Sequence, residues 1–289
     1  MAHAVHYRTS TVNGLDVFHR EAGDAGAPVV VLLHGFPTSS HMFRNLIPAL
    51  ADRYRVIAPD HIGFGGSAMP SLAEFPYTFD ALTDVTSGLL DQLGVDRYAV
   101  YVQDYGAPIG WRLALRNPER ISAIITQNGN AYTEGFVKPF WDGLFGYAAA
   151  PGPDTEGPVR AALTTELVRW QYVNGVPDPT LVSPDNWIHD QALLDRPGND
   201  EIQLKLFRDY PTNVDLYPEV HRYFRESRVP LLAAWGANDE IFGPDGARAF
   251  RQDLPDAEIH LIDSGHFALE SHLEEITGHI RGFLARVLA

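Results

Sequence analysis

Residues 98–116 of the chain read YAVYVQDYGAPIGWRLALR. Tyr98–Gln103 is a mostly apolar run with the pattern of a strand covered on both faces, and Ala107–Arg116 has the pattern of a helix. Asp104 lies between the two, close to the small residue Gly106. A strand, a sharp turn and a helix form the arrangement that exposes a nucleophile at the end of a strand. Asp104 is therefore a candidate nucleophile, although an aspartate in front of a helix is also a common N-cap.

The same alternation of strand and helix extends on both sides of this stretch. Five further runs have the composition of buried strands: Pro28–Leu33, Arg55–Ala58, Ser122–Gln127, Pro230–Trp235 and Glu258–Ile262. Apolar residues have helical spacing over Phe79–Leu93, which is followed by Gly94, and over 273–287. Strands that alternate with helices indicate an α/β fold with a mostly parallel sheet flanked by helices.

The segment 134–226 interrupts this alternation. It contains no convincing buried strand, and its many prolines are interleaved with aromatic-rich helical pieces. The alternation resumes at Val229. We therefore predict an α/β core formed by residues 1–133 and 227–289, with a helical cap inserted over residues 134–226.

The composition argues against several classes of function. The chain has 289 residues, 37 acidic and 22 basic side chains, a net charge of −15 and no cysteine. Without cysteine there is no disulfide scaffold, thiolate metal site or thiol nucleophile, and the acidic charge disfavours a nucleic-acid surface. No apolar run approaches the roughly 18 residues of a membrane helix, and residues 1–8 lack the pattern of a secretory signal. We expect a cytoplasmic monomer or homodimer that acts on a small molecule and binds neither nucleic acid nor membrane.

Two polar residues near the end of the chain extend the candidate site. Asp239 and His266 each follow one of the last two predicted strands. Functional groups of open α/β sheets gather at the carboxyl ends of the strands, and the order nucleophile, acid, histidine is that of a known catalytic triad. We expect Asp104, Asp239 and His266 to lie together.

Three segments of the sequence resemble one family. They are HGFPTSSHMFRNLIP at residues 34–48, DHIGFGGS at 60–67 and VQDYG at 102–106. In this order they are similar to the α/β-hydrolase superfamily, and within it to the haloalkane dehalogenases and epoxide hydrolases, which use an aspartate nucleophile. The resemblance covers nearly the whole chain. It implies an α/β-hydrolase fold with an inserted helical cap, and catalysis without a cofactor or a metal.

The resemblance also implies a role for each residue of the site. Asp104 would attack a saturated carbon and form an ester, and His266, held by Asp239, would activate the water that hydrolyses the ester. The backbone N–H groups of Phe36 and Tyr105 would form the oxyanion hole.

Some relatives carry the acid of the triad after the preceding core strand. This chain has Asn128 and Asn130 there, and both are amides. Asp239 is therefore the expected acid.

Two positions depart from the dehalogenase pattern. Phe36 and Tyr105 stand where dehalogenases usually have side-chain N–H donors for the leaving halide, and a phenylalanine side chain cannot donate a hydrogen bond. A cap tryptophan would have to serve instead, and Trp141, Trp170 and Trp187 are the candidates. These departures disfavour ordinary dehalogenation.

Epoxide hydrolases tolerate an HGFP loop, because they need an acid for the ring oxygen and take it from cap tyrosines. Tyr147 and Tyr217 are the candidates in this chain. We therefore expect the opening of epoxides of small to medium, largely apolar substrates. Carbon–halogen hydrolysis and another α/β-hydrolase activity are the alternatives. A ligand-binding protein without catalysis is disfavoured, because all three triad positions are filled.

Overall fold

The computed structural model describes residues 4–288, and residues 1–3 and 289, at the ends of the two core segments, lie outside that description. An eight-stranded sheet forms the centre, with the order β1-β2-β4-β3-β5-β6-β7-β8. The strands are β1 (His6–Val12), β2 (Leu15–Ala22), β3 (Val29–Leu33), β4 (Arg55–Pro59), β5 (Tyr98–Gln103), β6 (Ile121–Gln127), β7 (Leu231–Gly236) and β8 (Glu258–Ile262). From β4 to β8 all neighbouring strands run parallel.

The six strands expected from the sequence are confirmed as β3 to β8, within one residue at each end. The strand that leads to Asp104, β5, is buried at all six of its positions. Its continuous apolar run follows from this environment, because helices cover both faces of a parallel sheet.

The first two strands were not expected. They form an antiparallel hairpin, and most of β1 is exposed, so its sequence lacks the apolar run of a buried strand. The turn is Asn13–Gly14, where both residues have positive φ, 52° and 83°. An Asn-Gly pair is the strongest short hairpin signal in a sequence, and it marks this turn.

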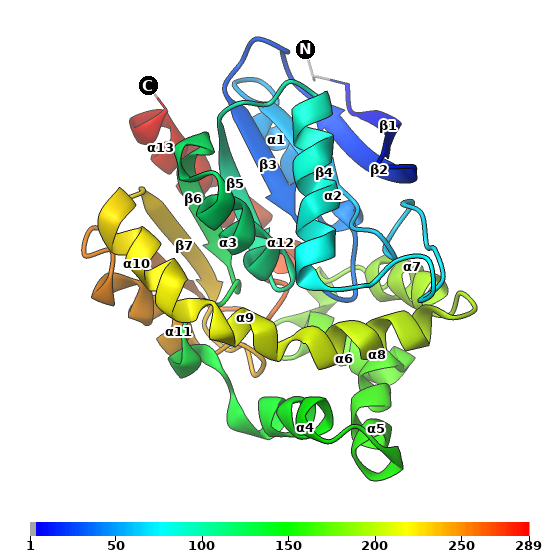
Figure 1. Cartoon of the computed structure of the whole chain (residues 1–289). Coiled ribbons are helices and arrows are strands. Elements are labelled where there is room, and N and C mark those ends of the chain that lie inside the picture. The colour runs from blue at the N-terminus through cyan, green and yellow to red at the C-terminus, as the bar shows by residue number, and fades with distance from the viewer. Residues whose placement is uncertain (1–3, 289) are drawn as a thin grey trace.

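Helices cover both faces of the sheet. Those of the core are α1 (Leu46–Leu50), α2 (Phe79–Gln92), α3 (Gly106–Arg116), α11 (Pro244–Ala249), α12 (Ala268–Ser271) and α13 (Leu273–Val287). In Figure 1, α2 and α3 lie in front of the sheet, and α1 and α13 lie behind it. Short 3-10 turns are found at Ser40–Phe43, Pro118–Arg120, Thr133–Gly135, Ala161–Leu163, Pro179–Leu181 and Phe250–Gln252. No helix among residues 4–288 is long and apolar enough to cross a membrane.

The connection from β6 to β7 is helical, as expected for an insertion. Its helices are α4 (Lys138–Ala149), α5 (Pro153–Arg160), α6 (Thr165–Val173), α7 (Asp185–Leu194), α8 (Asn199–Asp209), α9 (Pro211–Asp215) and α10 (Tyr217–Ser227). We refer to these helices and their connections as the insertion. Most of them lie below the carboxyl ends of the parallel strands in Figure 1. The last helix, α10, packs instead against α3, where the rings of Phe224 and Trp111 are 5.6 Å apart.

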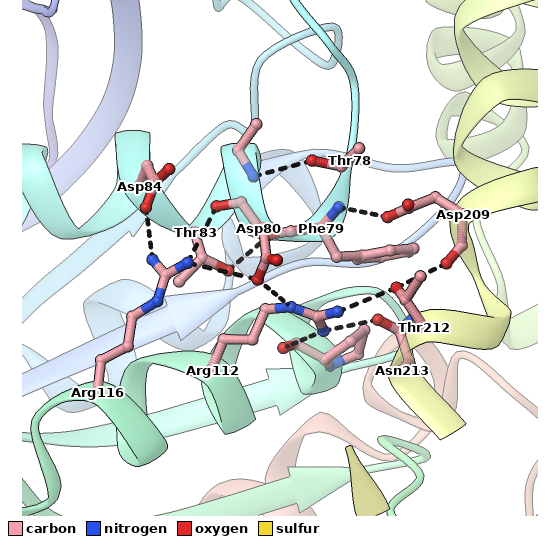
Figure 2. A network of polar contacts seen from close by, with 12 residues as sticks. Thr78, Phe79, Asp80, Thr83, Asp84, Arg112, Arg116, Asp209, Thr212 and Asn213 are labelled. Carbon is pink, nitrogen blue, oxygen red and sulfur yellow. Dashed lines mark hydrogen bonds and ion pairs between the residues drawn. The ribbon is translucent and has the colours of Figure 1, made fainter. Parts of the chain in front are cut away.

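A network of polar contacts joins the insertion to α2 and α3 (Figure 2). The buried guanidinium of Arg112 donates to Asp80 Oδ1 at 2.8 Å, to Thr212 Oγ1 at 3.1 Å and to Asn213 Oδ1 at 2.6 Å. Asp209 Oδ2 accepts from the backbone N–H of Phe79 at 2.8 Å. The network therefore fixes the junction between α8 and α9 on both sides of Tyr210.

We expect Arg112→Met to lower the free energy of unfolding by about 3 kcal/mol, because the buried oxygens of Asn213 and Pro108 lose a charged donor. Arg116→Met is the matched control on the same helix, since its partners Asp80 and Asp84 have side chains that are 70% and 65% exposed. Exposed ion pairs contribute little, so the control should cost less than about 1 kcal/mol. Urea unfolding of both variants measures the difference, and equal losses would contradict the anchoring role of Arg112.

Candidate active site

Asp104 lies at the tip of the turn between β5 and α3. Its φ is +46°, in the left-handed region that residues other than glycine rarely adopt. Its Oδ1 accepts the backbone N–H of Tyr105 at 2.6 Å and that of Phe36 at 2.7 Å. The two N–H groups expected to form an oxyanion hole therefore converge on one carboxylate oxygen, and Oδ2 is left free to react.

Two glycines allow the backbone to approach the nucleophile this closely. A Cβ on Gly106 would lie 2.1 Å from the carbonyl oxygen of Leu33, so only glycine lets α3 begin against β3. A Cβ on Gly35 would lie 2.2 Å from Cβ of Asp104. The loop after β3 can thus place the N–H of Phe36 on the carboxylate. The Phe36–Pro37 peptide bond in this loop is cis.

His266 and Asp239 complete the group expected from the sequence. His266 Nδ1 donates to Asp239 Oδ2 at 2.8 Å, and His266 Nε2 lies 3.8 Å from Asp104 Oδ2. The three residues come from the turns after β5, β7 and β8, and all of them are buried. When Nδ1 carries the ring proton and donates it in the hydrogen bond to Asp239, the ring is neutral. Its Nε2 then faces Asp104 as an acceptor.

Asn128 is a residue of the site whose contribution the sequence did not reveal. It follows β6 with a φ of +48°, and its Nδ2 donates to Asp239 Oδ2 at 2.8 Å. The backbone N–H of Ile241 donates to the other oxygen at 2.7 Å. The carboxylate of Asp239 is therefore held in the orientation that faces His266. In the sequence, the signal for this role was the position of Asn128 directly after a core strand.

Burial and nearby charges shift the pKa values of Asp104 and His266. Burial raises the pKa of Asp104, against the opposing effects of His266 and of the N–H groups of Phe36 and Tyr105. Burial by itself lowers the pKa of His266, but the carboxylates of Asp239 and Asp104 outweigh it, so the pKa of His266 lies above its ordinary value. An imidazole with a raised pKa between two carboxylates is suited to accept a proton.

Aromatic side chains of the insertion surround the nucleophile. The ring of Tyr210 is 6.1 Å from that of Tyr105 and 4.5 Å from that of Trp141, and Phe207 is 5.3 Å from Phe36. The hydroxyl of Tyr210 makes no hydrogen bond with any residue in the described part of the chain. Burial raises the pKa of Tyr210, and Tyr217 and Asp104 are nearby groups that add to this effect.

Of the four expected substrate-binding residues, Tyr217 and Trp141 lie beside Tyr210, whereas Tyr147 and Trp187 have other neighbours. Tyr217 lies by Tyr210 and accepts from Asn130 Nδ2 at 3.4 Å, and Trp141 packs on Tyr210 but donates its indole N–H to the carbonyl of Ile241 at 2.8 Å. Tyr147 is buried in α4, and the charged groups that affect its pKa, Glu156, Arg208, Glu201 and Arg160, are outside the triad.

Trp187, in α7, is linked to His266 through two other side chains, Tyr172 and Phe267. Its ring is 6.2 Å from that of Tyr172, which stacks at 4.1 Å on Phe267, the neighbour of His266. Of Tyr147, Tyr210 and Tyr217, Tyr210 is the one whose pKa is affected by Asp104. Its place between the end of α8 and Pro211 was the only sign of this in the sequence.

A nucleophilic carboxylate, a paired histidine and two N–H donors can form and hydrolyse an ester. A family model described as alpha/beta hydrolase fold matches residues 28–273. The chain belongs to the α/β-hydrolase family.

Relatives of this α/β-hydrolase include named enzymes. An uncharacterized hydrolase of Saccharomyces cerevisiae is 44% identical, and the match covers 96% of this chain and 97% of the relative. A haloalkane dehalogenase of Mesorhizobium japonicum is 30% identical over 93% of this chain and 87% of its own. Epoxide hydrolase A of Mycobacterium tuberculosis is 40% identical over 46% of this chain and 41% of its own. The protein is therefore a hydrolase with dehalogenase and epoxide hydrolase relatives.

Solved structures share the fold. The crystal structure of a haloalkane dehalogenase from Bradyrhizobium elkani matches with a TM-score of 0.83 over 99% of both chains, at 23% sequence identity. The eight-stranded, mostly parallel sheet with flanking helices is therefore an α/β-hydrolase fold.

We expect Gly35→Ala to destabilise the α/β-hydrolase by about 2 kcal/mol, because the added methyl group displaces Asp104 and the Phe36 loop. Gly143→Ala in α4 is the control, since nothing lies within 4 Å of its added Cβ. Alanine favours a helix over glycine, so the control should be neutral or slightly more stable. Urea unfolding tests both, and an unchanged stability of Gly35→Ala would contradict the close approach.

Proposed function

We propose that this α/β-hydrolase opens epoxides through a covalent ester on Asp104. The observation that carries the proposal is the free hydroxyl of Tyr210 beside the nucleophile. The groups that could grip a halide are poorly placed, because Phe36 has no donor and the N–H of Trp141 is used by Ile241. Epoxide opening needs a proton donor for the ring oxygen, which Tyr210 supplies.

The first step is attack by the free oxygen of Asp104. Oδ2 forms a bond to an epoxide carbon, the bond from that carbon to the ring oxygen breaks, and the ring oxygen takes the proton of Tyr210. Oδ1 becomes the carbonyl oxygen of the ester and keeps its hydrogen bonds to Phe36 and Tyr105. No charge needs to leave the site, because the opened oxygen remains part of the substrate.

The second step is hydrolysis of the ester. His266 takes a proton from a water molecule, whose oxygen attacks Cγ of Asp104. The negative charge collects on Oδ1, where the two N–H groups stabilise it, and Asp239 stabilises the imidazolium. The bond between Cγ and the ester oxygen then breaks, and the alkoxide takes the proton of the His266 imidazolium and leaves as the diol. The carboxylic acid formed at Asp104 gives its proton to the tyrosinate of Tyr210, which restores both groups.

The insertion acts in this proposal as a cap that contributes the acid and an apolar wall, as expected for residues 134–226. The aromatic side chains next to Tyr210 and Tyr105 include Phe36, Phe79, Phe136, Trp141 and Phe207. A wall of this composition favours a largely apolar epoxide. Carbon–halogen hydrolysis remains the second candidate, because it uses the same two steps on Asp104 and is the activity named for one relative.

The His266→Gln variant should trap the ester, because the nucleophile is intact and the base is missing. Incubated with an epoxide, the whole protein should gain the full mass of the substrate, whereas a haloalkane would add its mass minus hydrogen halide. Intact-protein mass spectrometry makes the measurement. The double variant with Asp104→Asn should show no adduct. An adduct that persists without Asp104 would contradict the assigned nucleophile.

Single turnover of the wild-type enzyme in heavy-oxygen water provides an independent test of the second step. Because water attacks Cγ, the label should appear on the peptide that contains Asp104 and not in the first diol released. An active enzyme with an unlabelled Asp104 would rule out the ester.

We expect Tyr210→Phe to slow ester formation from an epoxide by about 10² to 10³, the usual contribution of a general acid. The substitution removes no hydrogen bond found in the described structure, so stability should change little. Tyr147→Phe is the matched control in the same insertion, and it should react within about twofold of wild type. Bromide release from a bromoalkane is the comparison, because a halide needs no proton; equal loss on both substrates would contradict an acid role for Tyr210.

A further inference from the structure

Gln103, the last residue of β5, contacts the catalytic histidine directly. Its side chain is fully buried, and its Nε2 lies 2.9 Å from His266 Nε2. An amide nitrogen only donates, so His266 Nε2 is the acceptor. This agrees with the neutral tautomer whose Nδ1 proton is on Asp239. Gln103 therefore occupies the lone pair that His266 needs as a base.

The amide oxygen of Gln103 has no partner. Oε1 is buried and makes no hydrogen bond with any residue from 4 to 288. It lies on the side of the nucleophile, because Oε1 and Asp104 Oδ1 are each 2.6 Å from the position that a Cβ on Gly35 would take. A half-turn of the amide would exchange nitrogen and oxygen, and the only hydrogen bond broken would be the one to His266.

A second glutamine shows what a purely structural role looks like. Gln127, at the end of β6, is equally buried, and its Nε2 donates to the backbone carbonyl of His266 at 2.7 Å and to Asn128 Oδ1 at 2.9 Å. Its Oε1 accepts from the hydroxyl of Tyr101 at 3.1 Å. Every polar atom of this amide is paired and none contacts the imidazole ring, so Gln127 has no reason to turn.

We propose that Gln103 is a positioning residue whose amide turns with the charge of His266. It donates to Nε2 of the neutral ring and, after a half-turn, accepts the Nε2 proton of the imidazolium on Oε1. The inference rests on the proposed hydrolysis of the Asp104 ester, in which the proton passes from water to His266. No bond to Gln103 forms or breaks.

The turn would help the second step in two ways. The imidazolium would gain an acceptor at the moment it forms, and such charge-assisted hydrogen bonds are roughly twice as strong as neutral ones. The NH₂ group would then take the place of Oε1, on the side of Asp104 Oδ1, where negative charge collects. The charged groups that face His266 in the described structure, Asp104 and Asp239, are unaltered by the turn.

Two substitutions of similar size separate the turning amide from a fixed one. Gln103→Met removes donor and acceptor together, and the stronger loss falls on the imidazolium, so the pKa of His266 should fall. Gln103→Glu keeps acceptors and adds negative charge, so the pKa of His266 should rise. NMR titration of protein with ¹⁵N-labelled histidine measures both shifts in the resting enzyme, with His266→Gln assigning the signal and Gln127→Met as the control that should shift neither way.

Kinetics supply the second readout. Gln103→Met should slow ester hydrolysis about tenfold more than it slows ester formation, as seen by the amount of ester that accumulates during turnover. Equal slowing of both steps would show a merely structural role and overturn the proposal. A rise in the pKa of His266 in Gln103→Met would show a fixed donor and would also overturn it.

The titration does not depend on the substrate. If epoxides leave no ester on Asp104, the proposed function fails while the opposite pKa shifts of the two variants still test the turning amide. If Gln103→Met does not fold, the wild-type side-chain amide of Gln103 gives the answer, because its two N–H signals should change as His266 titrates. Gln103 N–H signals that stay constant while His266 titrates would contradict the proposed half-turn of the amide.

Discussion

The grip of two backbone N–H groups on Oδ1 of Asp104 is the contact on which the rest of the site depends. It requires the loop after β3 and the start of α3 to meet at one oxygen, and both approaches are closed to any residue with a Cβ at positions 35 and 106. Because one oxygen is fixed by the backbone, the other, Oδ2, is the one that faces His266, 3.8 Å from its Nε2. The strained φ of Asp104 is held by these contacts and by the buried strand that precedes it.

Both carboxylate oxygens of Asp239 accept hydrogen bonds. Asp239 receives hydrogen bonds from Asn128, from the backbone at Ile241 and from His266. These hydrogen bonds hold the carboxylate in place beside the imidazole, and its charge raises the pKa of His266. The turn after β6 contributes no group to the proposed reaction, but its Asn128 holds the carboxylate of Asp239 in place.

Much of the fold could be predicted from local sequence, because buried parallel strands have continuous apolar runs and the chemistry follows their carboxyl ends. The order of Asp104, Asp239 and His266 was visible for that reason. Hairpin β1–β2 was missed because its exposed side chains leave only the Asn13–Gly14 turn as a signal. The tyrosine beside the nucleophile was missed because the direction of a side chain in the insertion depends on packing between segments distant in sequence.

Arg112 links two parts of the molecule that do different work. Arg112 of α3 holds Thr212 and Asn213 after Tyr210, and the backbone of Phe79 in α2 holds Asp209 before it. The segment around Tyr210 is thus tied to the two helices that lie on the same face of the sheet. By contrast, α5 contacts mainly α4 and α8. Substitutions in α5 can therefore change the outer side of the insertion without removing a hydrogen bond that holds Tyr210 or Asp104, whereas substitution of Trp141 in α4 would remove contacts to both Tyr210 and Ile241.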